Sequence, residues 1–223
     1  MRVLIVGASR GLGRGLAQAF AEEGVEVVAT VRERGTDYFP NQPAIRTFLL
    51  DLTDPDAGSR LGDAFRVSEL DALVITAGIL GPAHQSVAQV STDELSAMFV
   101  TNAIAPVRLA GAVLPLVRPG GVIAFMSSRT ASFTLNDTGD MALYRASKSA
   151  LNSLARSFAM ATALPAGRSV LLLHPGWVQT EMGGPDAPVP LKVSVTGLRA
   201  VITGSLDQPD CKFMDYLGQP LPP

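Results

Sequence analysis

The sequence predicts an α/β fold, a doubly wound parallel sheet with helices on both faces. Short apolar runs alternate with helix-length amphipathic stretches along the chain. Parallel neighbouring strands need crossover connections, and repeated strand–helix units supply them. Several apolar runs end in Gly, Asp, Ser or Pro, which are typical of the loops that gather at one edge of such a sheet.

The elements follow in order along the chain. The expected strands are residues 3–6, 25–31, 44–50, 72–75, 122–126, 169–173 and a short last strand at 212–214. The expected helices are residues 12–23, 56–65, 92–116, 142–163 and 193–202. Gly24 ends the first helix, Asp51, Thr53 and Asp54 offer N-caps for the second, and Pro106 kinks the third.

Composition narrows the class of protein. The 223 residues fit one domain, 1–223, with a substantial core. The formal net charge is −2, so the chain lacks the excess of basic residues that is typical of nucleic-acid-binding proteins, and we expect no nucleic-acid partner. Cys211 is the only cysteine, which excludes an intrachain disulfide and favours a reducing, cytoplasmic compartment. The apolar run before Gly7 is too short for a secretory leader, and Gly, Pro or charge interrupts every longer run, so we expect no membrane partner.

Small and polar residues directly follow the predicted strands. They are Gly7, Asp51, Gly78, Ser127-Ser128 and Pro175-Gly176. In a doubly wound sheet the carboxyl ends of the strands share one edge, and ligands bind there. We therefore expect these separate loops to line one crevice.

Gly7-Ala8-Ser9-Arg10-Gly11-Leu12-Gly13 stands at the mouth of the first strand. Glycines there allow a sharp turn and a close approach of the backbone to a ligand. Arg10, beside the second glycine of the motif, indicates that the ligand is an anion. The pattern alone is weak, because the chain has 21 glycines.

Tyr144 and Lys148 are four residues apart on a predicted helix and so share one face. A surface pair is the alternative interpretation. With three tyrosines and three lysines in the chain, chance gives about 0.04 such pairs, so this motif outweighs the glycines. The helix that carries the Tyr144 and Lys148 pair is the one that follows the strand ending in Ser127-Ser128.

With these motifs in this order, the chain resembles the short-chain dehydrogenase/reductase family from Arg2 to about Gly184, which implies a Rossmann-like fold. The glycine motif resembles the family's cofactor loop, and Thr76-Ala77-Gly78 its Asn-Ala-Gly turn, with Thr76 in place of Asn. The residues that resemble the catalytic tetrad are Asn102, Ser128, Tyr144 and Lys148, and Pro175-Gly176 resembles the turn before Thr180. Residues 174–184 resemble one branch, the Sniffer and C-factor type of carbonyl reductase.

The resemblance implies a role for each of these residues. Tyr144 would give a proton to the alkoxide that forms when a hydride reaches a carbonyl carbon. Lys148 would favour the phenolate by its charge and contact the nicotinamide ribose. Ser128 would orient the substrate oxygen, with Ser127 as the alternative, since the spacing from Ser128 to Tyr144 is longer than is common in the family. Asn102 would hold a water in a proton relay, or is only a polar residue near the helix kink.

The cofactor expected is NADP(H). A pyrophosphate suits the helix N-terminus near Gly11. After the second strand, Val31 holds the place of the acid that would bind a ribose 2′-OH, and Arg32 follows it. Arg10 could reach the same 2′-phosphate, although Arg32 could also simply cap the strand end. The complete set of expected cofactor contacts is Gly7, Ser9, Arg10, Gly11, Leu12, Gly13, Arg32, Asp51, Leu52, Ala77, Gly78, Tyr144, Lys148, Pro175, Gly176, Val178 and Thr180.

The resulting hypothesis is an NADPH-dependent carbonyl reductase for a small aldehyde or ketone. Its cofactor half would span about 1–125 and its catalytic and substrate half about 126–223. The short segment 182–196 would be the substrate lid, and family habit implies a homodimer or homotetramer. The alternatives are a sugar epimerase or dehydratase, which would usually add a larger C-terminal domain, and a nucleotide-binding signalling or sensor protein of the same fold.

Overall fold

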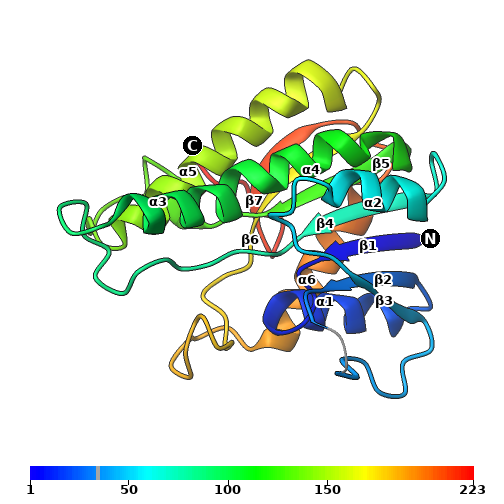
Figure 1. The fold of residues 1–223 in the computed structure, drawn as a ribbon, viewed down its shortest axis with the longest axis horizontal. Coiled ribbons are helices and arrows are strands. Elements are labelled where there is room, and N and C mark those ends of the chain that lie inside the picture. The colour runs from blue at the N-terminus through cyan, green and yellow to red at the C-terminus, as the bar shows by residue number, and fades with distance from the viewer. Residues whose placement is uncertain (34–35) are drawn as a thin grey trace.

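The computed structural model describes residues 1–33 and 36–223, and its centre is a twisted sheet. The strands follow the order β3-β2-β1-β4-β5-β6-β7, and each neighbouring pair is parallel. Their bounds are β1 Arg2–Val6, β2 Glu26–Val31, β3 Ile45–Leu49, β4 Leu70–Ile75, β5 Val117–Met126, β6 Ser169–His174 and β7 Cys211–Asp215. The chain winds outward from β1 in one direction and then from β4 in the other, so the switch point lies between β1 and β4 (Figure 1).

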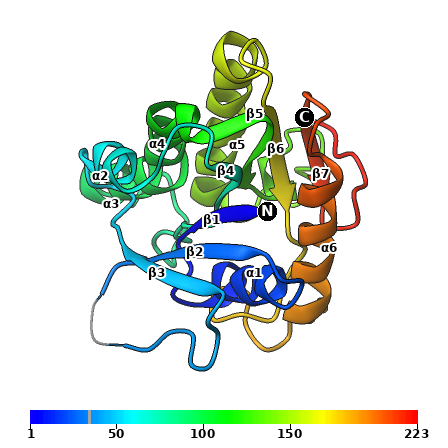
Figure 2. The same ribbon diagram turned by 90° about the vertical axis from the view of Figure 1, so that its right-hand side faces the viewer.

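Helices cover both faces of the sheet, as predicted. Their bounds are α1 Gly11–Ala21, α2 Ala57–Ala64, α3 Thr92–Phe99, α4 Ala105–Val113, α5 Ala142–Phe158 and α6 Leu191–Gly204. Figure 2 shows α1 and α6 on one face and α2, α4 and α5 on the other. A hydrophobic core fills each interface: Leu16, Phe20 and Leu198 pack on one side, and Leu61, Leu109 and Leu151 on the other. Almost fully apolar strands are expected where both faces are buried.

The predicted helix 92–116 is continuous but irregular. A π-helical turn, Val100–Ile104, joins α3 to α4, and a 3-10 turn, Leu114–Leu116, ends the run. The irregularity lies directly before Pro106, where the kink was predicted, because proline has no N–H to donate to the preceding turn. Contrary to expectation, Thr92–Leu116 is long and apolar enough to match a membrane span by length and composition. Its residues Leu109, Ala110 and Val113 are instead buried in the core.

Two local expectations need correction. Strand β5 begins at Val117 rather than at residue 122, because the register against β4 shifts between Leu70 and Ala72 and so accommodates the Pro-Gly-Gly stretch. Helix α2 begins without a side-chain cap. Asp51 and Asp54 instead accept the backbone N–H groups of Thr53 and Asp56, which makes two local turns before the helix.

Candidate active site

The glycine turn between β1 and α1 is pressed against the turn that follows β4. Gly7 has φ +91°, and a Cβ there would lie 2.7 Å from the Ala77 nitrogen. A Cβ on Gly13 would collide with the Gly7 carbonyl oxygen. On Gly11 a Cβ would meet only Thr180, at 3.8 Å. Thr180 therefore faces the N-terminus of α1 across Gly11, and the first N–H groups of a helix suit an anion.

Two threonines hold this turn in place. The Thr30 hydroxyl accepts the Gly7 N–H at 3.0 Å. The Thr76 hydroxyl donates to the carbonyls of Val6 and Gly7 at 2.9 and 3.1 Å. Thr76, at the position where the family usually has Asn, therefore has a clear structural partner. Sequence reasoning missed Thr30, whose only signal is a polar residue near the end of an apolar strand.

Both residues expected to bind the 2′-phosphate are exposed. Arg32 is exposed after β2, and Arg10 forms an ion pair with Glu181, Nη1 to Oε2, at 2.8 Å. Hydrogen bonds from Thr53 hold the pKa of Asp51 below its usual value, and the nearby positive charge of Arg32 adds to this effect. Ser9 and Leu12 are half-buried in and after the turn. Leu52 belongs to the core, so only its backbone can face the crevice.

Asn102, Lys148 and Gly78 meet at the carboxyl end of β4. The fully buried Asn102 accepts the Ile79 N–H and donates to the Ile79 carbonyl, each at 2.8 Å. Its amide also donates to the Ser147 hydroxyl at 3.0 Å. The position of a Cβ on Gly78 lies 3.2 Å from Asn102 Oδ1 and 3.4 Å from Lys148 Nζ. The π-helical turn is what carries Asn102 into this corner.

Tyr144 and Lys148 share one face of α5, as predicted. Lys148 Nζ lies 5.7 Å from the centre of the Tyr144 ring and donates to the Met126 carbonyl at 2.9 Å. Burial lowers the pKa of Lys148 to about 8 and raises the pKa of Tyr144 to about 12. From the sequence we expected the opposite effect, a lowering of the pKa of Tyr144 by the charge of Lys148. In the protein alone burial dominates, so the phenol keeps its proton at neutral pH.

The two serines after β5 have different partners. The Ser127 hydroxyl donates to Asn152 Oδ1 at 2.6 Å, across to α5. The Ser128 oxygen accepts the Thr130 N–H and hydroxyl at 3.1 and 2.9 Å. A hydroxyl has two acceptor positions and one donor. Thr130 fills both acceptor positions of Ser128, which leaves that hydroxyl a donor.

The segment after β6 lies opposite the glycine turn, where Thr180 faces Gly11. The Ser194 hydroxyl donates to the Pro175 carbonyl at 2.6 Å, and Gly176 has φ +89°. Val178 is buried and pairs with Val189. Thr180 accepts the Gly183 N–H at 3.1 Å, so the turn that faces Gly11 is internally braced.

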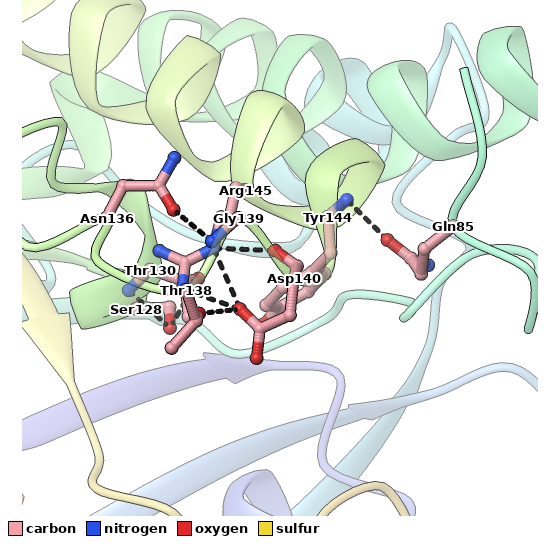
Figure 3. Close-up of polar contacts among 9 residues, drawn as sticks. All are labelled: Gln85, Ser128, Thr130, Asn136, Thr138, Gly139, Asp140, Tyr144 and Arg145. Carbon is pink, nitrogen blue, oxygen red and sulfur yellow. Dashed lines mark hydrogen bonds and ion pairs between the residues drawn. The ribbon is translucent and has the colours of Figure 1, made fainter. Parts of the chain in front are cut away.

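A polar hollow adjoins Ser128 and α5, and sequence reasoning did not find it. Its lining includes Arg129, Thr130, Asp137, Asp140 and Arg145. Figure 3 shows Arg145 directed at Asp140 in the loop before α5; the Nη2–Oδ1 distance is 2.7 Å. This ion pair ties the end of the loop to the helix that bears Tyr144.

The fold and this edge together define a dinucleotide-binding α/β protein. Residues 1–188 match the short chain dehydrogenase family. The chain belongs to that family, which confirms the resemblance found in the sequence.

Individual relatives give the same result. The C-signal protein of Myxococcus xanthus is 40 % identical over 156 residues, 69 % of this chain and 92 % of that protein. A carbonyl reductase from Pseudomonas aeruginosa PAO1 in complex with NADP is 44 % identical with a TM-score of 0.90, covering 99 % of this chain and 98 % of that one. The carbonyl reductase Sniffer of D. melanogaster is 30 % identical with a TM-score of 0.88, covering 99 % and 98 %. The predicted Sniffer and C-factor branch is therefore confirmed.

Proposed function

We propose that this chain is an oxidoreductase that reduces a small aldehyde or ketone to an alcohol with NADPH. The observation that carries the proposal is the pair on α5, in which the Nζ of the buried Lys148 lies 5.7 Å from the ring of the half-buried Tyr144, beside Asn102 and Gly78. The Pseudomonas aeruginosa relative, a carbonyl reductase in complex with NADP, supports the proposal.

Tyr144 acts as the general acid. Its raised pKa, about 12, keeps the phenol protonated and able to donate when an alkoxide oxygen forms. Lys148 then stabilises the phenolate, because an ammonium close to a developing negative charge lowers the free energy of the charged form. The carbonyl gains a hydride at carbon and a proton at oxygen, and NADPH when bound is the hydride donor.

Ser128 and Asn102 have supporting roles next to Tyr144 and Lys148. Because Thr130 occupies both acceptor positions of Ser128, the serine O–H is left to donate to the substrate oxygen. Asn102 holds the backbone at Ile79 and, through Ser147, the turn of α5 that bears Tyr144. Asn102 would hold a water in a proton relay to Lys148, and both side chains lie beside Gly78.

The residues proposed to bind the cofactor come from loops that follow the strands at their carboxyl ends. The pyrophosphate would bind at the α1 N-terminus beside Gly11, with Thr180 opposite, while Gly7 and Gly13 let the turn pack closely against Ala77 and against itself. Arg10 and Arg32 would take the 2′-phosphate near Asp51, and Ala77, Gly78, Pro175, Gly176 and Val178 would line the nicotinamide end. An exposed arginine pair is well suited to a phosphate, since the guanidinium group matches phosphate geometry.

The first test is binding of NADPH and NADH to the purified protein, by quenching of Trp177 fluorescence or by calorimetry. We expect NADPH to bind at least about tenfold tighter, a difference of about 1.4 kcal/mol. Consumption of NADPH with a panel of aldehydes and ketones then tests the reaction. Equal binding of both cofactors would refute the 2′-phosphate assignment, and binding of neither would refute the oxidoreductase.

A second candidate is a signalling or sensor protein of the same fold. The 40 % identity to a protein named C-signal favours it. Tyr144→Phe separates the two: a sensor keeps its biological output with the phenol removed, and an enzyme that acts through its product loses it. Retention of Ser128, Tyr144 and Lys148 in one chain supports the enzyme.

A further inference from the structure

The loop after β4 folds back onto the first turn of α5, and Gln85 makes the connection. Its side-chain oxygen accepts the backbone N–H of Tyr144 at 2.9 Å. Its side-chain nitrogen donates to the carbonyls of Leu80 and Pro82 at 3.0 and 2.8 Å. Figure 3 shows the Gln85 side chain reaching the start of the helix beside Tyr144.

The start of α5 lacks a local side-chain cap. Met141 precedes the helix in a left-handed conformation, φ 51°, and offers no capping side chain. The first N–H groups of any helix have no partner within the helix, and a nearby Ser, Thr or Asp usually supplies one. Here Gln85, 59 positions earlier in the chain, satisfies the N–H of the very residue that bears the phenol.

The carbonyl of Tyr144 is tied to the same loop by a second route. It accepts the Ser147 hydroxyl at 2.8 Å, and that hydroxyl accepts the Asn102 amide at 3.0 Å. Asn102 in turn holds both backbone groups of Ile79. A closed ring of hydrogen bonds thus joins residues 79–85 to both backbone polar groups of Tyr144.

We propose that Gln85 is a positioning residue that holds the Tyr144 phenol in register with Ser128 and the cofactor. It acts through the backbone of Tyr144, since its contacts are to main-chain groups. Small displacements of a proton donor are costly, because a misplacement of about 1 Å can reduce a rate about 100-fold. The inference rests on the proposed function, since it assumes that the phenol donates a proton.

The test compares Gln85→Met with the control Gln89→Met, which changes an exposed glutamine in the same loop. Methionine keeps the length of Gln85 but can neither accept the Tyr144 N–H nor donate to the loop carbonyls. We expect kcat to fall about tenfold, with substrate KM and NADPH Kd within about twofold of the wild type. Gln85→Glu keeps the acceptor for the Tyr144 N–H but loses the donor to the Leu80 and Pro82 carbonyls, so its kcat should lie between those of Gln85→Met and the wild type.

An unchanged kcat in Gln85→Met would overturn the proposal. So would a raised KM with kcat intact, because that pattern indicates a direct substrate contact. If Gln85→Met does not fold, Gln85→Asn decides: it tolerates the left-handed backbone of this position, φ 50°, but its side chain is one methylene too short to span the gap. It should show the same loss of kcat.

A second measurement does not depend on activity. Amide hydrogen exchange at the first turn of α5 should be faster in Gln85→Met and unchanged in Gln89→Met. A wild type that reduces no carbonyl with NADPH would refute the proposed function, and the exchange comparison would still decide whether Gln85 holds this turn. Equal exchange in all variants would overturn the positioning role.

Discussion

The two ends of the crevice are built in opposite ways. At the catalytic end, Asn102 and Ser147 are fully buried and Lys148 is 4 % exposed, and each side chain has a specific hydrogen-bond partner. At the phosphate end, the side chains of Arg10 and Glu181 are 70 % and 74 % exposed and meet in a single ion pair. One end is a buried hydrogen-bond network and the other is a pair of exposed charges.

The difference agrees with the roles that we propose for the two ends. Proton transfer needs atoms within hydrogen-bond reach, and a low local dielectric strengthens each polar contact. Recognition of a phosphate needs mainly charge, which acts over a longer range but is screened by salt. We therefore expect substitutions at the catalytic end to have large effects on rate, and those at the phosphate end smaller effects on affinity that depend on salt.

The largest effect should come from Tyr144→Phe. Loss of the general acid should lower kcat by about 100- to 10,000-fold, while NADPH Kd changes by less than about threefold. Steady-state rates and a fluorescence titration on the same sample measure both. A variant that keeps more than a tenth of the wild-type kcat would mean that another group supplies the proton.

The pH dependence should reflect Lys148. Its pKa, lowered by burial to about 8, means that the ammonium loses its proton as the pH rises through that value. The charge that stabilises the phenolate is present below this pH and absent above it, so kcat for reduction should decline on the alkaline side of about pH 8. A pH–rate profile checks this, and Lys148→Met should remove the alkaline decline while lowering kcat throughout. A flat wild-type profile to pH 10 would contradict the assignment.

A smaller effect is expected at the phosphate end. Arg10→Ala combined with Arg32→Ala should weaken NADPH binding about tenfold at low salt and leave NADH binding within about twofold. The difference should shrink at about 1 M salt, where the screening length is about 3 Å. Calorimetry at both salt concentrations decides the point, and Arg14→Ala on α1 serves as a matched control. Equal losses for both cofactors would argue against recognition of the 2′-phosphate.

The smallest effect should come from Glu181→Gln. In the protein without cofactor, Glu181 forms an ion pair with Arg10, so its carboxylate competes with a phosphate for the Arg10 guanidinium. Its removal should tighten NADPH binding by no more than about threefold, because exposed ion pairs contribute little. Titrations of the wild type and the variant side by side give the answer. A weakened NADPH affinity would instead indicate that the Arg10–Glu181 pair closes over the bound cofactor.

Much of this arrangement could be predicted from the sequence. The alternation of apolar runs and amphipathic stretches located each strand and each α-helix that the structure contains among residues 1–33 and 36–223, with α3 and α4 predicted as one helix. The spacing of Tyr144 and Lys148, with the glycines, led to the family. These signals are local and periodic, so a single sequence carries them.

What the sequence could not predict depends on contacts between distant segments. Gln85 is an ordinary glutamine in an irregular loop, and only the fold brings it to α5. The same holds for Thr30 beneath Gly7 and for Thr130 beside Ser128.

The start of β5 was missed because Pro119-Gly120-Gly121 has the composition of a turn, although pairing with β4 keeps it within a strand. The N-caps were misplaced because Asp51 and Asp54 bind backbone groups before α2 begins.

The π-helical turn at Val100–Ile104 bears on how related chains should be compared. A π turn holds one more residue than an α turn of the same length along the axis. Loss of a single residue between Phe99 and Ala105 would let the helix run regularly, and Asn102 would rotate about 100° around the axis, away from Ile79. In an alignment, a one-residue gap between Phe99 and Ala105 would therefore mark chains in which the equivalent of Asn102 cannot reach the backbone at Ile79. At this point in the fold, insertions and deletions are more disruptive than most substitutions.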